Sequence, residues 1–107
     1  MSFRTTTMSN GYWIALVDVE DIDGYKRYID ANKAVFNTYG GRFLIRNGEK
    51  SVVEGTMRSR VVVIEFETYQ IALDCYHSLE YQRAKSLRTP CSQADIVVIE
   101  GYLGQRE

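Results

Sequence analysis

Apolar residues recur with two different periods along this chain, and each change of period marks the boundary of an expected element. Residues 1–10 are mostly polar and precede an aromatic and β-branched run without glycine or proline at 12–19. A run of this kind predicts a strand. From 25 to 39 apolar side chains recur at spacings of three and four, and Gly40 follows. This stripe predicts an amphipathic helix that ends in a left-handed glycine cap.

The middle of the chain returns to the pattern of strands and turns. Residues 41–46 predict a strand, and the following Asn47-Gly48 dipeptide predicts a turn. A short return strand is expected at 51–55. Residues 60–67 contain enough consecutive apolar side chains to predict a strand in the centre of its sheet.

A second helical stripe follows, and it is interrupted at Ser78. A serine followed by a new periodic segment is a helix N-terminus signal, so two helical pieces are expected. In the second piece Tyr81, Ala84 and Leu87 are predicted to face inward. After the only proline, residues 95–102 predict the last strand.

The resulting order of two strand-helix-strand units predicts an α+β, ferredoxin-like fold of the β-α-β-β-α-β type. Right-handed crossovers then give an antiparallel sheet with strand order 4-1-3-2 and both helices on one face. The first and third strands are apolar on both faces. Because the helices cover only one face, a second copy of the chain is the simplest cover for the other, and a homodimer is expected.

Composition limits the remaining possibilities. The 107 residues fit one domain, expected at 11–107 after an N-terminal extension at 1–10. A net charge of −1 without a basic block argues against nucleic acid or an anionic membrane as partners. Two cysteines and one histidine match neither a disulfide framework nor a metal site, and no apolar run is long enough to span a bilayer. A cytoplasmic protein without a metal or other cofactor is therefore expected.

Taken together, the motifs of the chain resemble one known family. In order they are GYWIALVDV, YGGRFLIRNG, VVEG, RVVVIEF, YHSLEYQ and DIVVIEGY. In this combination the chain resembles the domain of unknown function 1330 (DUF1330) family, of the dimeric α+β barrel superfamily, over residues 11–102. The resemblance implies a ferredoxin-like fold whose sheets pack face to face in a dimer. It implies no activity, because none is assigned to the family.

The strand at 41–46 carries the first candidate site. Because side chains alternate along a strand, Arg42 and Arg46 are expected on one face and Phe43 and Ile45 on the other. Two guanidinium groups on one face predict a clamp for a small anionic ligand. The alternative is that both arginines are charged residues that protect a sheet edge from unwanted pairing.

Two further residues are candidates for moving a proton. Glu65 lies among apolar residues on the predicted central strand, where a carboxylate must be paired or used. It is either a general base or the partner of Arg42 on the neighbouring strand. His77, the only histidine, lies at the predicted helix break and is either a catalytic group at a pocket mouth or a helix-end side chain.

The first helix and the helix break supply the expected walls of a pocket. Asn32 lies on the apolar stripe where an aliphatic residue is expected, so its amide needs a partner. With Tyr39 on the same helix and Tyr76 beside His77, it is expected to line a polar cavity, or else to be a buried amide bonded within the core.

These observations leave two classes of function open. One is a cofactor-independent enzyme that acts on a small anionic or aromatic molecule, as related barrels do, with Arg42 holding the anion. The other is a non-catalytic ligand-binding or structural dimer.

Overall fold

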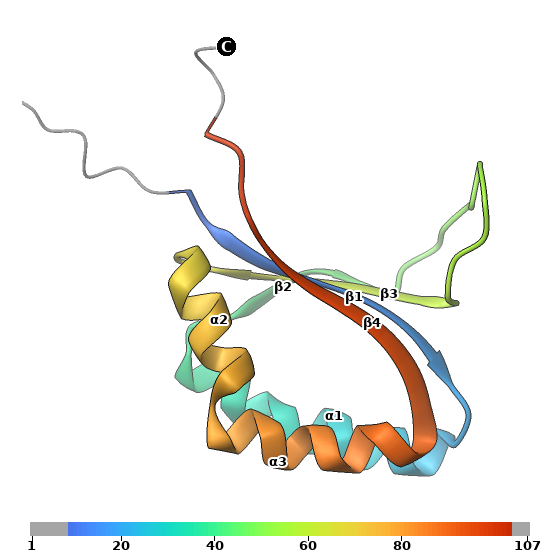
Figure 1. Ribbon diagram of the computed structural model, residues 1–107. Coiled ribbons are helices and arrows are strands. Elements are labelled where there is room, and N and C mark those ends of the chain that lie inside the picture. Colours follow the sequence, from blue (N-terminus) through green and yellow to red (C-terminus); the bar gives the residue numbers. More distant parts are fainter. Residues whose placement is uncertain (1–8, 104–107) are drawn as a thin grey trace, which may run out of the picture.

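The computed structural model describes residues 9–103, which form one four-stranded sheet with helices on one side (Figure 1). The expected N-terminal extension therefore lies largely outside the described residues. The elements in chain order are β1 (Gly11–Val19), α1 (Ile22–Thr38), β2 (Arg42–Arg46), β3 (Arg60–Phe66), α2 (Tyr69–His77), α3 (Leu79–Arg88), the short 3-10 helix η2 (Thr89–Cys91) and β4 (Ser92–Glu100).

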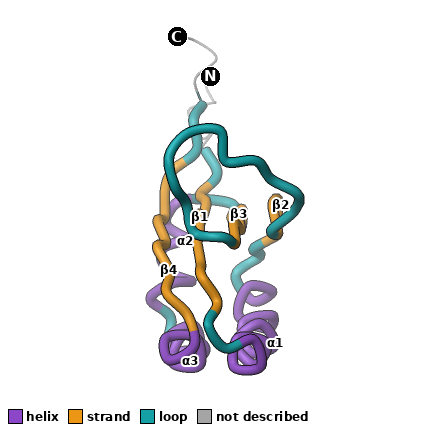
Figure 2. Tube along the Cα trace, turned by 90° about the vertical axis from the view of Figure 1, so that its right-hand side faces the viewer, coloured by secondary structure: helices purple, strands orange, loops and turns teal. Residues whose placement is uncertain are grey.

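The sheet has the strand order β2-β3-β1-β4, and every neighbouring pair is antiparallel. This is the order expected from the sequence. Figure 2 shows α1 and α3 lying next to each other on one side of the sheet, and no helix of the described residues lies on the other. We call this other side the helix-free face.

Local side chains fix the helix ends, and α1 begins at Ile22, ahead of the stripe that the sequence predicts from 25. The Asp21 side chain accepts a hydrogen bond from the Gly24 amide and so begins α1. Gly40 ends that helix with a φ of 70°, a conformation that residues with a Cβ rarely adopt. Ser78 Oγ donates to the Cys75 carbonyl at 2.7 Å and accepts from the Tyr81 amide at 3.0 Å. One serine therefore ends α2 and begins α3, and the predicted break is confirmed.

The core lies between the helices and the sheet, and Trp13 of β1 is at its centre. Its ring is 1% exposed and contacts the rings of Phe36 and Tyr81 at centroid distances of 5.0 and 4.8 Å. Its indole Nε1 donates to the Ala72 carbonyl at 2.8 Å, so the ring is buried with its polar atom satisfied. These contacts join β1 to all three helices.

The structure corrects several boundaries. No strand forms at 51–55; instead the whole connection 47–59 extends away from the domain on the side of the helix-free face (Figure 1). Arg58 anchors its base through ion pairs with Asp18 and Asp95 at 3.0 and 2.9 Å. Leu87, which was expected to face inward, is partly exposed, and Arg88 is buried in its place.

The last strand begins at Ser92, earlier than expected. Contacts with the fold also begin before residue 11. Ser9 is buried, and the Asn10 side chain donates to the Phe66 carbonyl at 3.3 Å. Both residues therefore contact the described fold, at the end of the expected extension.

Candidate functional site

A hydrogen-bonded array of three side chains lies on the helix-free face at one end of the sheet. Arg42 Nε and Nη2 lie 2.8 and 2.7 Å from Glu65 Oε1, and the Tyr12 hydroxyl donates to Glu65 Oε2 at 3.0 Å. The array forms because Glu65 on β3 is the register partner of Arg42 on β2 and of Tyr12 on β1. Of the two roles that the sequence left open for Glu65, the ion pair with Arg42 is present.

The array fixes the protonation state of its two acidic groups. The hydrogen bond from Arg42 lowers the pKa of Glu65, burial opposes this, and the bond from Tyr12 adds to it. The same hydrogen bond to Glu65 raises the pKa of the Tyr12 phenol. At neutral pH Glu65 is therefore an ionised acceptor and Tyr12 a protonated donor.

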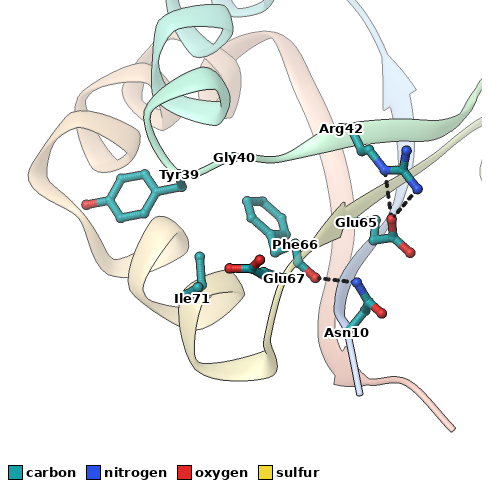
Figure 3. Close-up of a pocket in the computed structure, with 8 residues that line it drawn as sticks. All are labelled: Asn10, Tyr39, Gly40, Arg42, Glu65, Phe66, Glu67 and Ile71. Atoms are coloured by element: carbon teal, nitrogen blue, oxygen red, sulfur yellow. Dashed lines mark hydrogen bonds and ion pairs between the residues drawn. The ribbon is translucent and has the colours of Figure 1, made fainter. Parts of the chain in front are cut away.

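A cavity of about 410 Å³ opens beside this array. Figure 3 shows the Arg42 and Glu65 side chains on one side of Phe66, and Tyr39, Glu67 and Ile71 on the other. Two carboxylates and one guanidinium, which is already paired, line this cavity. The charged groups that remain available to a ligand are therefore mainly hydrogen-bond acceptors, and they lie next to an apolar wall.

The predicted clamp of Arg42 and Arg46 is not formed. The pairing of β2 with β3 shifts between Phe43 and Ile45, so an extra residue lies between them and reverses the alternation of side chains. Arg42 lies on the helix-free face with Glu65. The guanidinium carbon of Arg46 instead lies 4.4 Å from the centre of the Phe43 ring. The Phe43 ring also contacts Phe36 of α1, on the helix side of the sheet.

The remaining candidates are dispersed. His77 is exposed at the end of α2, and its ring meets the Tyr76 ring edge-on at 5.3 Å. Asn32 is buried on α1, at 6% exposure, as its place on the apolar stripe implies. Neither residue is among those that line the cavity beside Glu65, whereas Tyr39 is.

A second cavity, of about 510 Å³, lies between α3 and β4. It is lined by Tyr76 and by two cations, Lys85 and Arg88, that the sequence analysis did not select. The signal for Arg88 was the spacing 81, 84 and 88, which continues the buried stripe of α3 onto an arginine. The sequence analysis assigned this stripe position to Leu87 instead.

Two kinds of feature are absent from residues 9–103. No group of three or more histidine, cysteine, aspartate or glutamate side chains is arranged to hold a metal ion there. In the same range, no helix has the length and apolar character needed to cross a membrane.

Comparison with solved structures shows the same fold in several proteins. A protein of unknown function from Rhodopseudomonas palustris, RPA0582, superposes with a TM-score of 0.71 at 13% identity, covering 90% of this chain and 85% of that chain. SnoaB, a cofactor-independent oxygenase from Streptomyces nogalater, has a TM-score of 0.64 at 8% identity, covering 92% and 99%. A dimeric protein of unknown function and ferredoxin-like fold from Bacteroides fragilis has a TM-score of 0.58 at 13% identity, covering 86% and 96%.

These identities establish a shared fold and no shared activity. No curated protein matches the chain. The model of one family, the domain of unknown function DUF1330, matches residues 10–102, which is nearly all of the part that the structure describes. The resemblance seen in the sequence motifs is thus confirmed, and the chain belongs to the DUF1330 family.

Proposed function

We propose that the protein is a homodimer, joined through the helix-free face, that binds a small hydroxylated aromatic molecule in the cavity beside Glu65. The observation that carries the ligand part is the ionised Glu65 carboxylate, held by Arg42 and Tyr12 next to an apolar wall. The dimer part rests on the pattern of side chains across the sheet.

The helix-free face is built in rows that cross the strands. The central row is apolar in all four strands and consists of Ile45, Val63, Ile14 and Val97. Polar residues lie toward both ends of the face. One end carries the Tyr12, Glu65 and Arg42 array, and the other carries Asp18, Arg58 and Asp95.

An apolar centre with a polar rim is the usual composition of a protein interface. Val97 is 47% exposed in the single chain, which leaves much of its surface to be covered. A second copy of the chain is the partner we propose, because a fold neighbour, the Bacteroides fragilis protein, is described as dimeric. A twofold axis places the same apolar row on both sides of the contact.

The charges of the cavity select the ligand class. Arg42 is already bound to Glu65, and Glu67 adds a second carboxylate, so an anion meets more repulsion than attraction there. A hydroxyl group, by contrast, can donate to either carboxylate while its ring packs on Tyr39 and Ile71. This argument favours the aromatic ligand over the anionic one at this cavity.

The test compares three naphthalene probes by NMR titration of the labelled protein. We expect 2-naphthol to bind about tenfold more tightly than 2-methoxynaphthalene, which lacks the donor, a difference of about 1.4 kcal/mol. The amides of Tyr39 and Glu67 are expected to shift. Glu65→Gln weakens 2-naphthol binding, while Glu54→Gln, a matched change on the exposed 47–59 connection, leaves it unchanged.

The third probe, 2-naphthoate, separates this proposal from the anion clamp. If 2-naphthoate binds more tightly than 2-naphthol at this cavity, and loses its affinity in Arg42→Met, then Arg42 is an anion receptor and the proposal is wrong. Equal affinity for 2-naphthol and its methyl ether also contradicts it.

A cofactor-independent enzyme is the second candidate, and SnoaB is the observation that favours it, because that oxygenase shares the fold over 92% of this chain. Glu65 is the group that accepts a proton in this case, although its lowered pKa makes it a weak base. Oxygen uptake in the presence of a hydroxylated aromatic compound, absent in Glu65→Gln, distinguishes turnover from binding alone.

A further inference from the structure

Arg88 is a buried cation without a carboxylate partner. Its side chain belongs to a residue that is 5% exposed, and its Nε has no hydrogen-bond partner in the structure. None of the ion pairs within residues 9–103 includes Arg88. A buried charge is costly unless it is paired, so a guanidinium in this state needs an explanation.

The immediate surroundings keep Arg88 charged. Its guanidinium carbon lies 5.5 Å from the centre of the Tyr28 ring, and the hydroxyls of Tyr28 and Tyr81 lie 2.8 Å apart. Burial acts to lower the pKa of Arg88, but the interactions with Tyr81 and Tyr28 outweigh it, and the pKa is raised. Tyrosine hydroxyls are neutral partners, so the positive charge itself remains uncompensated.

A second cation faces the same cavity. Lys85 precedes Arg88 by three residues on α3, so both side chains lie on one face of the helix. The Lys85 ammonium lies 5.8 Å from the centre of the Tyr76 ring. Both residues line the cavity of about 510 Å³ between α3 and β4.

The rest of the cavity wall adds no free negative charge. Asp95 is the one acidic residue among the described residues that line it, and its carboxylate lies on the helix-free face, where Oδ2 is paired with Arg58 at 2.9 Å. Ala94 and Ile96 of β4 supply apolar surface opposite the cations. The cavity therefore joins an excess of positive charge to a small apolar surface, whereas the cavity beside Glu65 has an excess of negative charge.

We propose that the cavity between α3 and β4 is a binding site for the carboxylate of a small organic acid, with Arg88 and Lys85 as its receptor. The planar guanidinium of Arg88 matches a carboxylate in geometry, and Lys85 adds a second positive charge. The body of the acid lies against Tyr76 and Ile96. A cavity of this volume is within the usual range for small-molecule sites.

This site does not depend on the function proposed above. The Glu65 array lies on the helix-free face and Arg88 on α3, among residues that cover the other face. Glu65→Gln is therefore expected to leave binding at Arg88 unchanged, so that either proposal can fail alone.

The test uses NMR titration with benzoate, with its neutral analogue benzamide, and with inorganic phosphate. We expect benzoate to shift the amides of Ser92, Ala94 and Ile96 and to bind at least about tenfold more tightly than benzamide. Phosphate tests whether any oxyanion suffices. If phosphate binds as tightly as benzoate, the apolar wall contributes nothing and the carboxylic acid class is wrong.

Three variants at low salt assign the receptor. Lys85→Met is expected to weaken benzoate binding about tenfold, and Arg88→Met to weaken it further. Arg83→Met removes the same charge from the exposed surface of α3 and is expected to change the affinity by less than about twofold.

If Arg88→Met fails to fold, Lys85→Met and the benzamide comparison still decide the question. Equal binding of benzoate and benzamide would overturn the proposal. So would a loss of affinity in Arg83→Met as large as that in Lys85→Met, because the effect would then be one of net charge alone.

Discussion

The ion pair between Arg42 and Glu65 makes a quantitative prediction about stability. Arg42→Met removes the guanidinium, Glu65→Gln removes the negative charge, and the double variant removes both. A pair buried on both sides costs about 3 to 5 kcal/mol when one partner is lost. Here the Arg42 side chain is 73% exposed, while that of Glu65 is 14% exposed. Solvent therefore screens the pair, and we expect a coupling free energy of about 1 kcal/mol.

The assay is urea unfolding of the four proteins at one fixed protein concentration, because the stability of a dimer depends on concentration. The coupling is expected to shrink when salt is raised, since the pair is partly exposed. A coupling near zero would mean that the two groups do not interact. A coupling above about 3 kcal/mol would mean that the pair is buried from both sides and that Arg42 does not keep, in the dimer, the exposure it has in the single chain.

The same pair makes stability depend on pH in a defined direction. The folded protein holds the pKa of Glu65 below its usual value of 4.5, so the unfolded chain binds more protons in acid. The contribution of the pair is thus complete above the unfolded pKa and is lost as the pH falls through the folded one. Glu65→Gln is expected to flatten this part of the stability profile, and an unchanged profile would contradict the assignment.

Two substitutions and one labelling experiment also test the fold. Gly11→Ala places a methyl group in collision with the Thr68 carbonyl oxygen and is expected to cost about 1 to 3 kcal/mol by urea unfolding, whereas Gly48→Ala meets no neighbouring atom and serves as the control. Ser78→Ala removes the side chain that begins α3 and is expected to cost about 1 kcal/mol; an unchanged midpoint would show that this cap is unimportant. Burial raises the pKa of Cys75 to about 12, so this thiol is expected to react with a disulfide reagent only after unfolding, and rapid labelling of the native protein would refute its burial.

The fold was predictable because its elements depend on local patterns. Gly40, Ser78 and the run at 60–66 mark a helix end, a helix break and a central strand, and each of these features is present. The bulge in β2 was not predictable, since nothing in the residues Phe43 to Ile45 shows that the register with β3 shifts there. That one-residue shift moved Arg46 to the opposite face and removed the predicted clamp.

The candidate site was only partly predictable for a similar reason. The pairing of Arg42 with Glu65 depends on the register between β2 and β3, which the sequence of the connection 47–59 does not reveal, so the sequence could offer the pair only as an alternative. Arg88 was missed because a charged residue at the end of a helix ordinarily faces solvent, and leucine was the more probable core residue at that turn. A cation on a buried stripe is the signal to look for in related sequences.

The molar mass in solution tests the account most directly, since the dimer is its central claim. Light scattering at micromolar concentration is expected to give twice the 12.3 kDa of the single chain. Val97→Asp, on the central row of the helix-free face, is expected to give the single-chain mass with unchanged circular dichroism, while Leu79→Asp, on the exposed start of α3, leaves the dimer intact. A mass of 12.3 kDa for the unmodified protein would contradict the account.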